Sequence, residues 1–166
     1  MTKDIVVGLD DSASAWAALT WAASHARATG ARLRAIHVLG AAEARELYAL
    51  PVMGPYVYPD DAELDPIWTA TGRRVFTRLQ PEPSWTLRFG VGHPGQVLLD
   101  ASQDAELLVL GTREHRGIGR LINGSVSHYC INHATCPVLA VPSSVPDVVA
   151  PPAGATPEQH HAAAGR

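Results

Sequence analysis

Short apolar runs alternate with stretches of helical periodicity along most of the chain. Residues 5–7 form a β-branched run that stops at Gly8, which is typical of a parallel strand buried on both faces. A helix is predicted next, with Asp11 or Ser12 as its cap and Gly30 as its stop. Its apolar face is formed by residues at helical spacing, namely Ala15, Leu19, Ala22, Ala23 and Ala26.

The same alternation continues to residue 142. Strands are predicted over residues 33–39, 85–89, 107–110 and 137–142, and helices are predicted from Pro66, from Pro94 and over residues 125–132. The face of the helix from Pro66 is assigned to Ile67, Thr71, Val75 and Leu79. The order β-α-β-α-β-α-β-α-β predicts a doubly wound α/β domain with a parallel sheet.

Two strands have the features of sheet edges. Residues 85–89 alternate apolar with polar side chains, and the last strand has proline at both ends, Pro137 and Pro142. Residues 40–59 carry a weak signal: a short helix fits residues 41–50, and the prolines that follow predict a long irregular loop with a functional or mobile character.

Composition narrows the class of protein. The 166 residues are 46% hydrophobic and 17% charged with a formal net charge of -3, which fits one globular domain and argues against electrostatic capture of nucleic acid. The start of the chain has no long apolar segment, so we expect a cytoplasmic protein with no membrane contact. We expect the domain over residues 1–142 and a disordered Pro/Ala-rich tail over residues 143–166.

No motif for catalysis or metal binding is present. The eight histidines are scattered without metal-ligand spacing, and Cys130 and Cys136 are too far apart in sequence for a C-x-x-C pair, so we interpret both as ordinary buried or half-buried thiols. G-x-S-x-G and the GKS or GKT ending of a P-loop are both missing. We therefore predict no catalytic residues, no metal site and no enzyme activity beyond slow incidental ATP hydrolysis.

The stretch LLVLGTREHRGIGRLINGSVS, residues 107–127, is the strongest candidate for a binding site. It consists of an apolar strand, a glycine-rich basic loop and a helix start. Backbone N–H groups of such a loop, the unpaired donors of a helix N-terminus and nearby arginines favour a phosphate. The competing interpretation is a surface loop whose residues only cap a helix.

Several motifs together resemble the universal stress protein family. They are IVVGLDDS with its following helix, AIHV in the second strand, LLVLGT in the fourth, and NGSVS and CPVLAVP near the end. The resemblance covers residues 4–142. It implies a five-stranded parallel sheet in the order 3-2-1-4-5, of the adenine nucleotide alpha hydrolase-like kind. It also implies ATP or another adenine nucleotide as ligand, alone or with Mg2+, and a homodimer formed through the last strand near Val138 and Val141.

The resemblance also assigns roles to individual residues. ATP-binding members share a G-x2-G-x9-G-[ST] loop, which begins here at Gly111 and ends at Gly124 and Ser125. Asp10 would contact the adenine and ribose side or merely cap the helix, and the backbone of Val38 would read adenine or merely fill a buried strand. Gly8 would end the strand beside the nucleotide or be needed only for packing. Ser125 would help to bind the phosphates or act only as the N-cap of the helix. The phosphates would be held by Gly111, Thr112, Arg113, Gly124, Ser125 and Val126.

Glu114 departs from this pattern, because it stands where the middle glycine belongs. It removes access to positive φ, and a carboxylate about 5 Å from a phosphate charge costs roughly 3 kcal/mol at an effective dielectric near 20, about a hundredfold in affinity. Arg113, His115, Arg116 and Arg120 can offset this charge. The sequence therefore predicts a dimeric, nucleotide-binding stress-response regulator or protective factor. The alternative is a member that does not bind ATP and works through protein contacts.

Overall fold

The computed structural model describes residues 4–40, 42, 44, 56–58, 66–112 and 125–143. The strands are β1 (Asp4–Leu9), β2 (Arg32–Gly40), β3 (Tyr56–Val57), β4 (Thr86–Gly92), β5 (Leu107–Thr112) and β6 (Val138–Pro142). The helices are α1 (Ala13–Thr29), α3 (Pro66–Arg78), α4 (Pro94–Ala101) and α5 (Ser125–His133). None of the helices in this part of the chain has the length and apolar character needed to cross a membrane.

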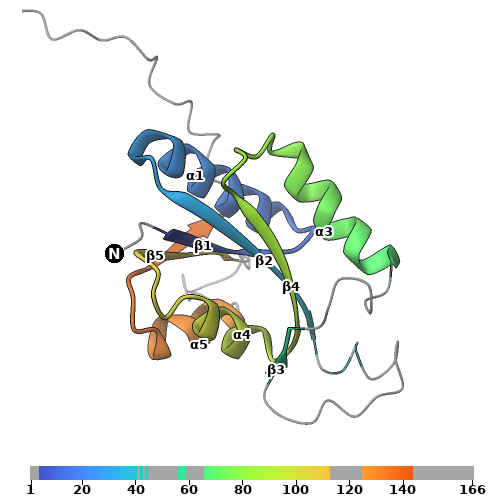
Figure 1. Cartoon of the computed structure of the whole chain (residues 1–166). Coiled ribbons are helices and arrows are strands. Elements are labelled where there is room, and N and C mark those ends of the chain that lie inside the picture. The colour runs from blue at the N-terminus through green and yellow to red at the C-terminus, as the bar shows by residue number, and fades with distance from the viewer. Residues whose placement is uncertain are drawn as a thin grey trace, which may run out of the picture.

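The strands form one sheet in the order β3-β4-β2-β1-β5-β6 (Figure 1). β1 lies at its centre, where Ile5 pairs with Leu33 of β2 on one side and with Leu107 of β5 on the other. Apart from β3, all neighbours are parallel, so the five long strands follow the order 3-2-1-4-5. The predicted fold class and strand order are confirmed.

β3 is an addition that the sequence did not predict. Tyr56 and Val57 lie within the stretch expected to be an irregular loop, and they pair antiparallel with Gly92 and Val91 at the end of β4. A two-residue strand has no periodicity to detect, because alternation needs at least four residues to stand out. β4 is therefore covered at its carboxyl end, whereas β6 ends the sheet on the other side.

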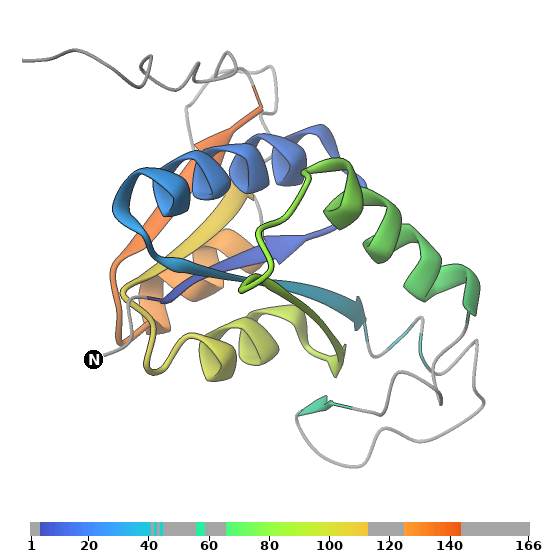
Figure 2. The same cartoon turned by 45° about the horizontal axis from the view of Figure 1, so that its top comes forward.

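Helices cover both faces of the sheet. α1 and α3 lie on one face and α4 and α5 on the other, as Figure 2 shows from a second angle. The larger core joins α1 to the sheet through Leu19, Leu33 and Val109, and the second core joins α4 and α5 through Leu98, Leu108 and Cys130. This is the arrangement of a doubly wound fold.

α1 forms as the sequence predicts. All five residues of its expected apolar face are buried: Ala15, Leu19, Ala22, Ala23 and Ala26. Of the two expected caps, Ser12 takes the role, because its Oγ accepts a hydrogen bond of 3.1 Å from the backbone N–H of Ala15. Gly30 ends the helix with a φ of 70°, a conformation that favours glycine.

The expected face of α3 is wrong in part. The helix begins at Pro66 as predicted, but Ile67 is 80% exposed, and the side that meets the sheet carries Trp68, Thr69 and Gly72. The pattern misled because Gly72 makes close contacts without an apolar side chain. The expected face is correct farther along the chain, where Val75 and Leu79 pack in the larger core.

Asp4 stabilises the end of the sheet at which β1 and β2 begin. Its carboxylate is nearly buried and accepts two hydrogen bonds from Arg32, at 2.8 and 3.0 Å, while Arg34 Nε lies 3.3 Å away. β1 and β2 are joined by this ion cluster as well as by their backbone ladder.

Cys130 is wholly buried between α5 and α4, with its thiol 3.8 Å from the carbonyl oxygen of Gly95. Burial, and to a smaller extent the charge of Cys136, raises the pKa of this thiol to about 11. Both cysteines are free. Cys130 is buried and Cys136 is half-buried, as the sequence predicted for structural thiols.

Candidate functional site

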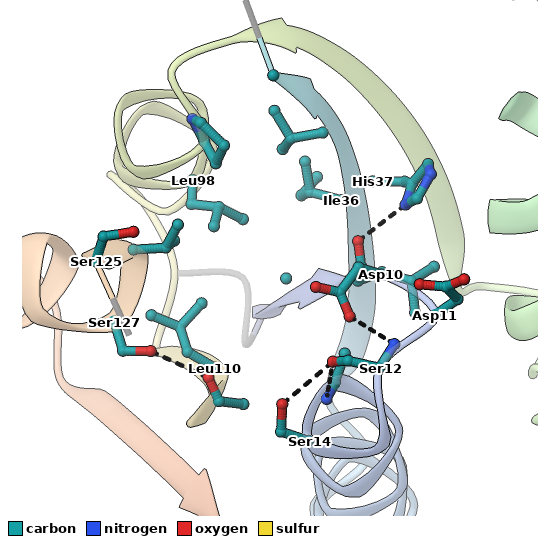
Figure 3. Close-up of a pocket in the computed structure, with 18 of the residues that line it drawn as sticks. Asp10, Asp11, Ser12, Ser14, Ile36, His37, Leu98, Leu110, Ser125 and Ser127 are labelled. Atoms are coloured by element: carbon teal, nitrogen blue, oxygen red, sulfur yellow. Dashed lines mark hydrogen bonds between the residues drawn. The ribbon is translucent and has the colours of Figure 1, made fainter. Parts of the chain in front are cut away.

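A cavity of about 940 Å³ opens at the carboxyl ends of β1, β2 and β5. Ligands bind at this edge in doubly wound sheets, where connections leave the sheet toward opposite faces. Its floor is apolar and includes Ile36, Leu98 and Leu110 (Figure 3). The walls are lined by residues from strand ends and helix starts, among them Gly8, Asp10, Ser12, Ser14, Val38, Gly111, Ser125 and Ser127.

The turn between β1 and α1 forms one wall. Asp10 Oδ1 accepts a 2.8 Å hydrogen bond from the backbone N–H of Ser12, which fixes the carboxylate at the mouth of the cavity. Ser12 caps α1, and its hydroxyl also lies 3.1 Å from that of Ser14. The wall thus presents a carboxylate and two hydroxyl groups in a locally fixed arrangement.

Ser125 and Ser127 face this turn from across the cavity (Figure 3). They lie in the first turn of α5, where backbone N–H groups lack helical partners and the helix dipole is positive. Ser127 Oγ donates a 3.0 Å hydrogen bond to the carbonyl oxygen of Gly111, which ties the start of α5 to the end of β5. This end of the cavity favours an anion.

Close packing of β5 on α1 requires glycine at position 111. A Cβ at this position would lie 2.4 Å from the carbonyl carbon of Ser14 and 2.7 Å from the backbone nitrogen of Ala15. The end of β5 therefore rests on the first turn of α1 through bare backbone. Glycine is required for this contact whether or not a ligand is bound.

The wall beside β2 is aromatic. His37 is buried, and its Nδ1 donates a 2.9 Å hydrogen bond to the carbonyl oxygen of Leu9. Its ring stacks on Trp68 of α3 with centroids 4.7 Å apart, and Trp68 also lines the cavity. His37 is therefore packed and hydrogen-bonded at the end of β2.

The start of α4 completes the rim. His93 precedes the helix and Pro94 begins it, and both line the cavity. The His93 ring contacts Tyr129 of α5 with centroids 5.0 Å apart, so α4 and α5 meet beside the opening. Among the described residues, no group of three or more His, Cys, Asp or Glu side chains could hold a metal ion.

Most of the predicted site residues meet at this cavity. Those that line it are Gly8, Asp10, Val38, Gly111, Ser125 and Val126. Thr112 lies buried at the end of β5 and is not part of the lining. Arg113, Glu114 and Gly124 lie outside the described residues. Ser125 is the first residue of α5.

Other lining residues were missed as site residues. Ser14 and Ser127 each follow a predicted helix start by two residues, and that spacing was the available signal. His93 directly precedes a predicted helix, as Ser12 does. Trp68 also follows a predicted helix start, Pro66, by two residues.

A smaller hollow of about 340 Å³ lies on the other side of the β1–α1 turn. Asp10, Asp11 and Ser12 line both hollows, so this turn separates them. The remaining lining comes from α1 and α3, with the guanidinium of Arg78 4.3 Å from the centre of the Trp16 ring.

The fold and the cavity together define a doubly wound α/β protein with a small-molecule site at the carboxyl edge of its sheet. Residues 1–142 match the model of the universal stress protein family. The chain belongs to this family, which confirms the resemblance found in its motifs.

Two relatives are similar over part of their length. Universal stress protein Sll1388 of Synechocystis is 45% identical over 53 residues, which cover 31% of this chain and 34% of that protein. A universal stress protein of Mycolicibacterium smegmatis is 28% identical over 153 residues, which cover 82% of this chain and 47% of the relative. The chain therefore spans less than half the length of either relative.

Solved structures share the fold. A universal stress protein in complex with cAMP is 23% identical with a TM-score of 0.59, and the match covers 86% of this chain and 98% of that one. The universal stress protein from Archaeoglobus fulgidus in complex with dAMP is 18% identical with a TM-score of 0.52, with coverages of 84% and 97%.

Proposed function

We propose that this protein binds ATP or another adenine nucleotide in the 940 Å³ cavity and acts as a dimeric stress-response regulator or protective factor. The observation that carries the proposal is the polarity of the cavity. Ser125 and Ser127 at the start of α5 form an end suited to phosphate, and Asp10 and Val38 form the opposite end, suited to a base and a sugar.

The spacing of the strands supports this assignment. β2 and β5 pair with opposite sides of β1, and strands in a sheet lie about 4.8 Å apart, so Val38 and Gly111 are on strands about 10 Å apart. A nucleotide laid across the end of β1 covers such a distance. The volume also falls within the range of ligand sites, which is roughly 300–1,000 Å³.

The ligands of the two structural neighbours, cAMP and dAMP, agree with an adenine nucleotide. ATP and Mg2+ follow from the G-x2-G-x9-G-[ST] resemblance. Arg113, Glu114 and Gly124 of that loop lie outside the described residues, so the effect of Glu114 is a question for experiment.

We assign a homodimer to the edge formed by β6. This strand pairs with β5 on one side and ends the sheet, and Val138, Leu139 and Ala140 are half-buried within the subunit. A second copy that packs on this edge would bury them further.

A binding role fits the cavity better than catalysis. The hydroxyl of Ser12 caps α1 and that of Ser127 bonds to the Gly111 carbonyl, so both are engaged in holding the fold. We also propose the cytoplasm as its compartment, as expected from the sequence.

Isothermal titration calorimetry with ATP, AMP and cAMP, with and without Mg2+, tests the proposal. We expect binding of at least one of them, weakened in Asp10→Ala and unchanged in Asp104→Ala, an exposed carboxylate outside the cavity. Lack of any adenine nucleotide binding at millimolar concentration with Mg2+ would overturn it. Gain of ATP binding in Glu114→Gly would then support the protein-contact alternative.

A further inference from the structure

α3 contributes one aromatic side chain to the lining of the cavity, Trp68. Its ring stacks on His37 at a centroid distance of 4.7 Å and an interplanar angle of 26°. It also meets the edge of Phe89, with centroids 5.2 Å apart and planes at 62°. Both geometries are favourable for aromatic pairs, so the indole is held on two sides.

Gly72, one helical turn after Trp68, sets how closely α3 approaches the sheet. A Cβ there would lie 2.9 Å from the Phe89 ring and 3.1 Å from the His37 ring. Only a residue without a side chain permits this approach, which brings Trp68 onto His37. The wall is therefore built into the fold before any ligand arrives.

The same wall is tied to the β1–α1 turn. His37 Nδ1 donates a 2.9 Å hydrogen bond to the carbonyl oxygen of Leu9, the residue before Asp10. The aromatic wall is therefore joined to the residue next to Asp10.

The chemistry around Trp68 excludes a phosphate at this end. Its ring packs against His37 and Phe89, and Asp10, which follows the Leu9 to which His37 bonds, would repel an anion. The hydroxyls and the helix start that favour an anion lie across the cavity from His37, at Ser125 and Ser127 (Figure 3). The group that contacts Trp68 must therefore be apolar or aromatic.

We propose that Trp68 contacts the base of the bound nucleotide and makes the site selective for ligands that join a planar aromatic base to an anion. This inference rests on the proposed function. It adds a base-recognition residue, Trp68, whose position depends on Gly72.

The test compares how the parent protein and its Trp68 variants bind two kinds of ligand. Loss of a base–aromatic stack weakens binding by roughly five- to a hundredfold, so we expect Trp68→Ala to weaken ATP binding by such a factor. Trp68→Phe keeps a ring and should stay within a few-fold of the parent. Inorganic tripolyphosphate, which has no base, should bind all three proteins equally.

Tryptophan fluorescence supplies a readout that does not depend on affinity. ATP should quench the parent and Trp21→Phe equally, because Trp21 lies on α1 against His25 and outside the cavity. Most of this quenching should disappear in Trp68→Phe, whose fold is checked by circular dichroism. This readout holds even if Trp68→Ala does not fold.

Four results would overturn the inference. Unchanged ATP affinity in a folded Trp68→Ala, or full quenching in Trp68→Phe, would place the base elsewhere while the proposed function stands. Equal weakening of ATP and tripolyphosphate would show that Trp68 only supports the fold. A parent protein that binds no nucleotide would remove both proposals together.

Discussion

The carbonyl carbon of Ser14 would lie 2.4 Å from a Cβ added at Gly111, so β5 and α1 touch through backbone alone. We predict that Gly111→Ala lowers the free energy of unfolding by about 1–3 kcal/mol, because backbone cannot move aside as a side chain does. Gly8→Ala is the matched comparison. It meets only side-chain ends of Leu98 and Leu110, at 3.1 Å or more, and should cost less. Urea unfolding of both variants checks the order, and equal losses would contradict it.

Ser12 satisfies an N–H group at the start of α1. Ser12→Ala should lower the free energy of unfolding by about 1 kcal/mol, as for other N-caps. Ser84→Ala makes the same chemical change at an exposed turn, so it serves as the control and should have no measurable effect. Chemical denaturation followed by circular dichroism measures both, and a neutral Ser12→Ala would show that water replaces the cap without loss.

Asp4 is the shared counter-ion of Arg32 and Arg34 at the amino end of the sheet. Asp4→Asn should cost about 1–3 kcal/mol of unfolding free energy, because it weakens charged hydrogen bonds and leaves the largely covered Arg34 without its counter-ion. Glu82→Gln removes an ion pair with Arg27 in which both side chains are about half exposed, and should cost less than about 1 kcal/mol. A larger loss of unfolding free energy in Glu82→Gln than in Asp4→Asn would contradict this prediction.

Cys130 should resist thiol reagents in the folded protein. With a pKa of about 11, about one molecule in a thousand carries the thiolate at pH 8, and the side chain is fully buried as well. We predict one fast reaction with Ellman's reagent, at Cys136, and a second only after unfolding. Cys136→Ser should abolish the fast reaction, whereas fast labelling of that variant would contradict the burial of Cys130.

The same thiol makes stability depend on alkaline pH. The folded protein keeps the Cys130 proton from its ordinary pKa of 9.0 up to about 11, whereas the unfolded chain loses it. The folded state thus binds more protons in this window, and stability should fall as pH rises from about 9 to about 11. Cys130→Ala should reduce the dependence of the unfolding free energy on pH, measured by urea titrations at several pH values. An unchanged dependence would show that other groups cause it.

The layout of the sheet was predictable because its signals are local. Buried parallel strands such as β1 and β5 are continuous apolar runs, and α1 has both a cap at Ser12 and a stop at Gly30. The predicted site residues at strand ends also converge, because topology brings the carboxyl ends of parallel strands to one edge.

The features that the sequence did not predict depend on contacts between residues that are distant in sequence. Trp68 reaches the cavity only because Gly72 lets α3 approach His37 and Phe89, and no periodicity reveals a helix face built on glycine. Gly111 was interpreted as a phosphate-loop glycine, yet its neighbour is Ser14, far earlier in the chain. β3 is too short to leave a pattern.

The turn from Asp10 to Ser12 is a partition between two hollows of different character. The Asp10 carboxylate is held by the Ser12 N–H group, so it is a fixed negative charge that both hollows share, with Arg74 and Arg78 lining the smaller one. A substitution at Asp10 therefore changes the electrostatic potential in both hollows at once.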